Sequence, residues 1–243
     1  ATTEIYTGED TLSLHDALSD LENTQIIQDV LSHTPALPEG CAWMTYVRCH
    51  DDIGWNVLRP ELDARGPDQR ARLLRASQFF SGATPGSYAQ GAAFQASDPS
   101  VVHGTNGMAA ALVGITSAQT PEALEAAKSR LIMLQSLSLF VGGLPLIYMG
   151  DEWGQGNTSA QEIAQRNGPD GRELHRPMFD EVGFAHRLDP QTVQGQIYAA
   201  VRAFVQVRKR HASLSATHAL RVWDTGTPSV LGLKRGTDVL GLF

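Results

Sequence analysis

The sequence predicts a mixed α/β fold with buried parallel strands. Two short apolar runs, 42–47 and 144–148, lead within a few residues into the paired acids Asp51-Asp52 and Asp151-Glu152. Apolar runs of this length are typical of parallel strands that are covered on both faces. Stretches with helical spacing of apolar residues lie around them. Because ligands bind at the carboxyl ends of parallel strands, the acids predict a carboxylate-lined pocket.

The composition is that of an ordinary globular chain. Its 243 residues are 42% apolar and 19% charged, which allows a sizeable core in one or two domains. The formal charge of −7 and the pI near 5.6, without a dense Lys/Arg cluster, argue against nucleic acid and against an anionic membrane as partners. A neutral polar substrate is compatible with this charge.

The two cysteines are predicted to be free, and the first residues carry no secretory signal. If 42–48 is extended, Cys41 and Cys49 lie roughly 26 Å apart at about 3.3 Å per residue, which is beyond disulfide reach. We expect free, mostly buried thiols. No secretory signal is visible in the opening Ala-Thr-Thr-Glu, which favours the cytoplasm, and we expect the natural N-terminus to be missing.

The first half of the chain predicts two helices and a long insertion. Apolar residues at helical spacing predict a helix over 21–32, and Pro67 opens another over 67–80. The segment 81–106 is rich in Gly, Ser, Ala and Pro and predicts a loop. Strand-to-helix loops usually have about two to six residues. The longer excursion after Asp52 therefore predicts a subdomain that forms a wall or lid over the pocket.

The uncharged stretch 131–150 has the length of a membrane span, but its interior contradicts that interpretation. Gly142-Gly143 and Pro145 would interrupt a spanning helix. They suit a helix that begins after the N-cap Thr120 and ends near Val141, followed by a tight turn and a buried strand.

The last part of the chain predicts a loop, a helix and an antiparallel sheet. The polar segment 153–190 predicts a loop, and Asp189-Pro190 opens a helix that runs to about Arg210. Beyond 220 the apolar period changes to two, with glycine turns, which predicts β-hairpins. Only two parallel strands can be recognised, whereas a closed barrel needs eight, so we expect a fragment.

The residue types of His50-Asp51-Asp52 alone leave three interpretations open. They are metal ligands, a carboxylate site for sugars, and a solvated loop at the end of a strand. A metal site needs further ligands at suitable spacing, and the loops offer only the scattered His103 and His175.

Three motifs resemble glycoside hydrolase family 13, the α-amylase family. VRCHDDIGW (47–55) resembles its strand-seven motif and is most similar to the amylosucrase branch, and GGLPLIYMGDEWG (142–154) resembles its strand eight. DGR at 170–172 and HRP at 175–177 are similar to that branch's following loop. The resemblance, from about Leu37 to the end, implies the carboxyl-terminal fragment of a TIM (β/α)8 barrel enzyme with a lid subdomain and the start of a terminal antiparallel β domain.

The resemblance implies roles for four residues. Asp51 is the catalytic carboxylate that stabilises the oxocarbenium-like transition state, and His50 binds the same sugar. Asp52 lies near the acceptor side, and Arg172 closes the glucose pocket. No metal and no cofactor are implied.

Other conspicuous residues are expected to be structural. The Asp151-Glu152 pair is expected to organise the loop after strand eight. Trp55 and Trp153 favour packing over sugar stacking, and Trp43 is expected in the core.

Departures from the family pattern limit what the chain can do alone. The nucleophilic Asp and the acid Glu belong to strands four and five, and no segment before Leu37 resembles either, so we expect this fragment to be inactive alone. Glu173 stands where the amylosucrase branch commonly has an aromatic residue, and Gln90 where a basic residue is common.

The expected function is glucosyl transfer from, or hydrolysis of, sucrose or α-glucan oligosaccharides. Alternatives are a trehalose synthase-like or α-amylase-type member of the family, and a non-catalytic carbohydrate-binding scaffold. The expected parts are a barrel segment (1–52), a lid subdomain (53–118), the strand-eight barrel segment with its helices (119–212) and a truncated β domain (213–243).

Overall fold

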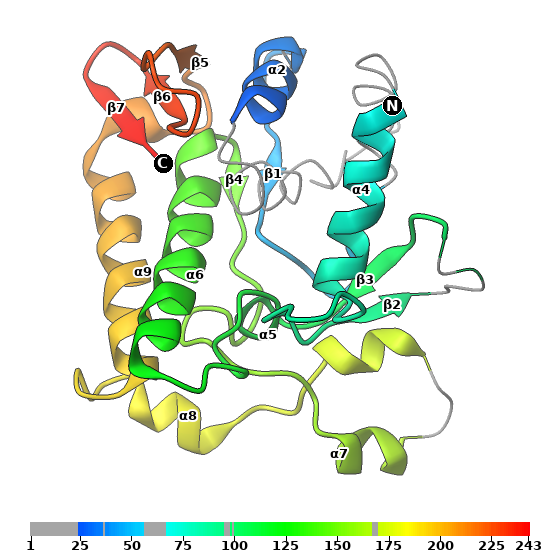
Figure 1. Ribbon diagram of the computed structural model, residues 1–243. Helices are drawn as coiled ribbons and strands as arrows, with labels where there is room; N and C mark the ends of the chain where they lie inside the picture. Colours follow the sequence, from blue (N-terminus) through cyan, green and yellow to red (C-terminus); the bar gives the residue numbers. More distant parts are fainter. Residues whose placement is uncertain (1–23, 36, 56–66, 95–97, 99, 167–169) are drawn as a thin grey trace. The chain divides into compact units, whose positions relative to one another are not determined.

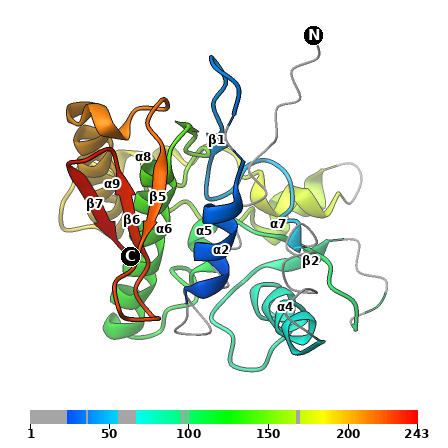
Figure 2. The same ribbon diagram turned by 90° about the horizontal axis from the view of Figure 1, so that it is seen from above.

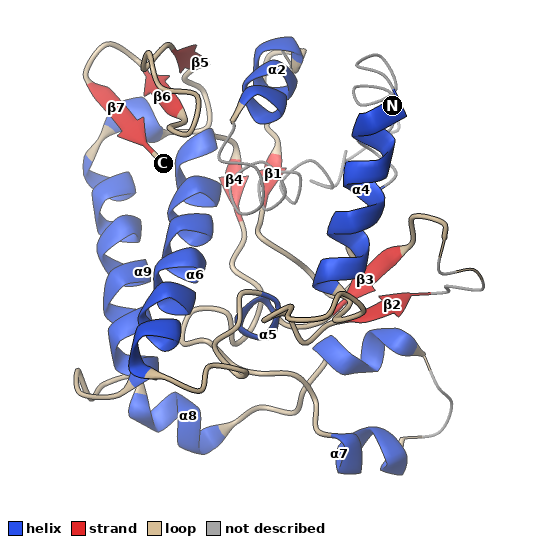
Figure 3. Cartoon of the chain, in the orientation of Figure 1, coloured by secondary structure: helices blue, strands red, loops and turns tan. Residues whose placement is uncertain are grey.

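The computed structural model describes residues 24–35, 37–55, 67–94, 98, 100–166 and 170–243, and confirms a mixed α/β chain (Figure 1; Figure 3). The chain divides into two compact units, each built from segments that are far apart in the sequence. Unit 1 comprises Ala1–Val47, Met133–Leu146 and Arg202–Phe243, and unit 2 comprises Arg48–Ile132 and Ile147–Val201.

Unit 1 contains the parallel strand pair that the apolar runs predict. Strand β1 (Met44–Thr45) pairs with β4 (Leu144–Pro145) in parallel register. Both strands are shorter than expected, and the second is not buried, because Leu144 is 58% exposed. Trp43 is half-buried rather than part of the core, and Cys41 is an exposed free thiol. Among the described residues β1 and β4 pair only with each other, which leaves one edge of each strand without a neighbouring strand.

A helix, a glycine turn and a strand occupy the uncharged stretch, as predicted. Helix α6 (Pro121–Val141) begins after Thr120, whose Oγ1 accepts a hydrogen bond of 3.2 Å from the amide of Ala123. Gly142 and Gly143 then have φ angles of 125° and 64°, which glycine adopts without a steric penalty. No helix in the described part of the chain has the length and apolar character needed to cross a membrane.

We expect Gly143→Ala to lower the free energy of unfolding by about 3 kcal/mol. A Cβ at this position overlaps the backbone carbonyl oxygen of Trp43, which cannot swing away. Gly40→Ala is the matched control, because Gly40 has a φ of 80° and nothing within 4 Å of a Cβ, so only the backbone strain of about 1–2 kcal/mol remains. Urea denaturation measures both variants, and an equal loss at the two positions would contradict the role of the close approach.

The alternating segment forms the predicted antiparallel sheet. Strands β5 (Leu220–Trp223), β6 (Gly232–Arg235) and β7 (Val239–Leu242) pair in chain order (Figure 2). Leu231 and Leu233 are fully buried in this part of unit 1. Helix α2 (Gln25–His33), which matches most of the predicted helix, packs beside β5.

Helix α9 (Val193–Arg210) begins three residues later than predicted. The Asp189-Pro190 segment forms a turn, and Thr192 caps the helix by accepting a hydrogen bond of 3.0 Å from the amide of Gly195. In unit 1, Arg208 donates to the carbonyl oxygens of Leu139 and Gly143 at 2.5 and 2.6 Å. These bonds fix the turn that precedes β4. A short 3-10 helix, η4 (Ala212–Leu214), follows.

Unit 2 contains a hairpin where the composition predicts a loop. Strand β2 (Ala92–Phe94) pairs with β3 (Gly104–Asn106) in antiparallel register, and α5 (Ala109–Leu112) follows. Thr105 of β3 also bridges to Ile53 through backbone hydrogen bonds of 2.8 and 3.0 Å. The hairpin therefore holds the segment directly after Asp52.

Two tryptophans pack in unit 2, as expected. Trp55 stacks on Phe80 at the end of α4 (Pro67–Phe80), with ring centroids 5.6 Å apart, and its Nε1 donates to Thr105. Trp153 is buried against Phe179 and Phe184. The segment predicted as a loop after Glu152 contains three short helices, α7 (Ala160–Gln165), η3 (Gly171–His175) and α8 (Glu181–His186).

Candidate functional site

A buried arginine holds the turn that carries the predicted catalytic carboxylate. Arg48 is 1% exposed, and its guanidinium donates to the carbonyl oxygens of Cys49 at 2.6 Å, of Asp51 at 2.7 Å and of Gly107. Burial lowers the pKa of Arg48, and the negative charge of the nearby Asp151 opposes this shift. One rigid planar group thereby fixes both ends of the 49–51 turn and connects it to the hairpin segment.

A neutral histidine and an arginine hold the middle of the same turn. The carbonyl oxygen of His50 accepts hydrogen bonds from Nε2 of His175 at 3.1 Å and from Arg176 at 3.0 and 3.1 Å. The amide of Gly107 donates to Nδ1 of His175 at 3.3 Å, so the proton of the imidazole lies on Nε2. All three carbonyl groups of the turn therefore accept hydrogen bonds from side chains.

The protonation of His175 should make folding stability depend on pH. Burial, and then the positive charge of Arg48, lower its pKa from 6.5 to about 3. Between these pH values only the unfolded chain binds the proton, so the contribution is complete above pH 6.5 and is lost as the pH falls toward 3. From pH 6.5 to 5 this costs about 1.7 kcal/mol. Urea denaturation at both pH values should show a smaller decrease for His175→Gln, and equal decreases would contradict the assignment.

The structure brings the four predicted site residues together in unit 2. Asp51 Oδ2 lies 3.4 Å from His50 Nε2, and Asp51 Oδ1 lies 3.3 Å from Arg172 Nη1. Arg172 Nε is 3.4 Å from Asp52 Oδ1, so this guanidinium bridges the two carboxylates. The Asp51 side chain is 48% exposed and that of His50 is 69% exposed. A carboxylate and an imidazole thus face solvent on a turn whose backbone is fixed.

Two neighbours shape the surroundings of the bridging arginine. Arg172 lies over the ring of Phe94, with its guanidinium carbon 4.7 Å from the ring centroid. Arg176 Nη2 lies 4.0 Å from Asp51 Oδ1. Gly104 gives Asp52 room, because a Cβ at position 104 would collide with its carboxylate. The hairpin therefore contributes both an aromatic face and a close backbone approach.

The Asp151-Glu152 pair supports its surroundings, as expected. Asp151 is fully buried near Arg48. Glu152 accepts a hydrogen bond of 2.9 Å from the amide of Gly150, and burial raises its pKa. Tyr148 donates to the carbonyl oxygen of His175 at 2.9 Å. The loop after β4 thus helps to fix groups that hold the 49–51 turn.

Sequence reasoning misses Arg48, His175 and Arg176 as site residues. Arg48 stands at the end of an apolar run, and a charge in that position was the available signal for a buried partner. The other two residues lie in a quoted motif, but their contact with His50 crosses more than 120 residues. Only the fold shows which backbone groups they bind.

A separate cavity of about 540 Å³ lies in unit 1. Residues of α2, of 34–35 and 37–45, of the Val141–Gly143 turn and of 216–220 form its walls. None of the four predicted site residues contributes to it. The cavity therefore does not identify the carboxylate site, which is defined by its charged groups.

The fold and the site define a mixed α/β protein with an exposed carboxylate between an imidazole and two guanidinium groups. Its sequence is 24% identical over 220 residues to trehalose synthase from Pimelobacter sp. (strain R48), covering 89% of this chain and 30% of that protein. Its structure is similar to sucrose 6F-phosphate phosphorylase from Thermoanaerobacter thermosaccharolyticum, with a TM-score of 0.65 and 13% identity, covering 96% of this chain and 41% of that chain. No family model matches the sequence. The chain shares its fold with part of the phosphorylase and spans less than half the length of either protein.

Proposed function

We propose that the chain is the carboxyl-terminal part of a retaining glycoside hydrolase family 13 enzyme that acts on an α-glucoside. The observation that carries the proposal is the exposed Asp51 carboxylate, held between His50 and Arg172 on a turn with a fixed backbone. The two relatives, named for trehalose and sucrose chemistry, support a carbohydrate substrate.

Asp51 stabilises the positive charge that develops on the sugar ring in the transition state. Its contribution depends on preorganisation, because a carboxylate that is already in place needs no reorganisation during the reaction. Arg48 supplies this by holding the Asp51 backbone, and Arg172 orients one carboxylate oxygen. His50 and Asp52 bind sugar hydroxyls, and Arg172 closes the glucose pocket. The reaction needs no organic cofactor.

The reacting pair of carboxylates comes from outside this chain. A retaining glycosidase needs a nucleophile and a general acid about 5 Å apart. The chain covers 30% of the trehalose synthase and 41% of the phosphorylase, which leaves room for the earlier barrel strands in a longer polypeptide. We therefore expect 1–52 and 119–212 to belong to a barrel, 53–118 to form a lid subdomain and 213–243 to begin a β domain.

Two sequence features favour different substrates within the α-glucosides. The motif DDIGW favours sucrose, as in the amylosucrase branch, whereas the sequence match to a trehalose synthase favours maltose isomerisation as the second candidate. Glu173, which replaces an aromatic residue of that branch, forms an ion pair with Arg166. The Glu173 side chain is therefore held by a neighbouring loop residue, which argues against a glucan-stacking role for position 173.

Product analysis tests the proposal. The longer polypeptide that includes the upstream strands is incubated separately with sucrose and with maltose. Fructose release from sucrose supports sucrose chemistry, and trehalose from maltose supports isomerisation. A reading frame without the nucleophilic Asp and the acid Glu would favour the non-catalytic carbohydrate-binding scaffold. Turnover by the present chain alone, free of contaminating enzyme, would refute the expectation that it is inactive.

A further inference from the structure

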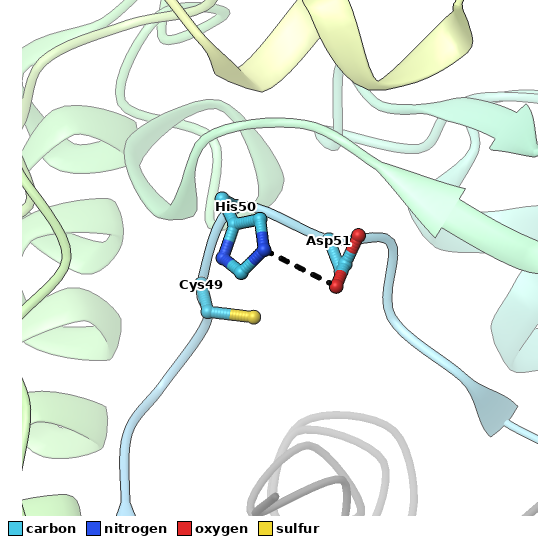
Figure 4. A group of neighbouring side chains, drawn as sticks. All are labelled: Cys49, His50 and Asp51. Atoms are coloured by element: carbon cyan, nitrogen blue, oxygen red, sulfur yellow. Dashed lines mark ion pairs between the residues drawn. The ribbon is translucent and has the colours of Figure 1, made fainter.

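Three metal-binding side chains converge at the exposed turn. The donor atoms of Cys49, His50 and Asp51 all lie within 4.8 Å of one another. Figure 4 shows the sulfur of Cys49, the ring of His50 and the carboxylate of Asp51 gathered on one side of the turn. A thiolate, an imidazole and a carboxylate are the three ligand types that zinc sites use.

The separation of two of these donors already suits a tetrahedral ion. Ligand bonds of about 2.0–2.2 Å at a tetrahedral angle place an imidazole nitrogen and a carboxylate oxygen about 3.4 Å apart. His50 Nε2 and Asp51 Oδ2 are 3.4 Å apart. The sulfur of Cys49 lies within 4.8 Å of both atoms. Its ideal separation from them is about 3.6 Å, so an approach of at most roughly 1.2 Å is needed, which side-chain rotation can supply.

The two oxygens of the Asp51 carboxylate face different partners. Its Oδ1 faces Arg172 at 3.3 Å and Arg176 at 4.0 Å, whereas its Oδ2 faces His50. The oxygen needed for an ion is thus on the side away from the guanidinium groups. These positive charges nevertheless oppose a cation, so the affinity should be below that of a closed structural zinc site.

The turn is prepared for binding by its backbone. Hydrogen bonds from Arg48, His175 and Arg176 hold the carbonyl groups of residues 49–51 in place. Only the side-chain torsions of the three ligands remain to be ordered. This lowers the conformational entropy that metal binding has to overcome.

We propose that Cys49, His50 and Asp51 form an inhibitory site for a zinc-class transition-metal ion. Binding replaces the thiol proton of Cys49 with a sulfur–metal bond and releases that proton to solvent, while water fills the fourth position. The ion occupies His50 and Asp51, so sugar and metal exclude each other. The inhibition rests on the proposed carbohydrate function, whereas the binding itself does not.

Metal titration of the chain tests the site without any enzyme assay. Zinc affinity is measured by competition with a chromophoric chelator, and cobalt is used to detect the thiolate-to-metal charge-transfer absorption. The wild type should bind one equivalent and show this absorption. Cys49→Ser should weaken binding by at least about 10-fold and abolish the absorption, and His50→Gln should weaken binding similarly. Cys41→Ser is the matched control, since it removes the other thiol, which is exposed and outside the turn.

The outcomes separate the site from the function. Wild-type zinc affinity in Cys49→Ser, or loss of affinity in Cys41→Ser, would overturn the site. If the longer polypeptide turns over an α-glucoside, zinc should inhibit it, chelator should restore it, and substrate should raise the zinc concentration needed. Binding through Cys49 without an effect on turnover would overturn the inhibitory role. Absence of any turnover would refute the proposed function and leave the binding result standing.

Discussion

Replacing Asp51 with asparagine, in the polypeptide that also carries the two upstream carboxylates, should reduce kcat by about 10²–10³-fold, equivalent to roughly 3–4 kcal/mol. Asparagine keeps the shape but removes the negative charge that faces the developing oxocarbenium ion. The loss should appear in kcat and in kcat/KM alike, because the interaction strengthens in the transition state. Steady-state kinetics on the substrate identified by product analysis measures it.

The same substitution should leave the fold intact. Asp51 is half-exposed, and its ion pairs with Arg172 and Arg176 are near solvent, where such pairs contribute about 0–1 kcal/mol. Asp189→Asn is the matched control, since Asp189 is exposed and accepts a backbone hydrogen bond that asparagine can also accept. Near-normal turnover by Asp51→Asn would sink the assignment, and so would an equal loss in the control.

Arg48→Met should lower the free energy of unfolding by about 3–5 kcal/mol. Methionine fills much of the same volume but leaves the carbonyl oxygens of Cys49, Asp51 and Gly107 without the guanidinium donor. It also removes the positive charge beside the buried Asp151. Each buried polar group that loses its partner adds to the cost. Urea denaturation at neutral pH gives the difference between variant and wild type.

Arg208→Met supplies the comparison for this prediction. Arg208 also donates to two carbonyl oxygens, but it is half-buried and no carboxylate contributes to its pKa shift. Its replacement should cost about 1–2 kcal/mol. If Arg48→Met lowered the free energy of unfolding by no more than this, the proposal that the buried Arg48 stabilises the 49–51 turn through its charge and its hydrogen bonds would be wrong.

Local patterns predict those parts of the fold that depend on neighbouring residues. The helix, glycine turn and strand around Gly142-Gly143 follow from the helix-breaking glycine and proline residues of one short segment. The β5–β7 sheet follows from apolar residues at every second position. The β2–β3 hairpin does not follow from its own composition. Thr105 of this hairpin also bonds to Ile53, 52 residues earlier in the chain, and no local period records such a contact.

The candidate site divides in the same way. His50, Asp51, Asp52 and Arg172 can be found from motifs, and the structure brings them together. Their functional roles remain predictions. Arg48 and His175 act on backbone carbonyls, which every residue has, so no residue type in the sequence marks their partners. The apolar run around Leu144 predicts burial, whereas Leu144 is exposed, because an apolar run does not show whether neighbouring elements cover it.

Both polar groups of the Gly107 backbone, its amide and its carbonyl oxygen, form hydrogen bonds with side chains. Its amide donates to His175, and its carbonyl oxygen accepts from Arg48, the same two residues that hold the 49–51 turn. Two stretches of chain separated by more than fifty residues thus share their donors and acceptors. We therefore expect the two stretches to lose their structure together on local unfolding. A substitution at or beside Gly107 can therefore displace the Asp51 turn from a distance, and loop grafting between similar proteins would have to transfer both stretches together.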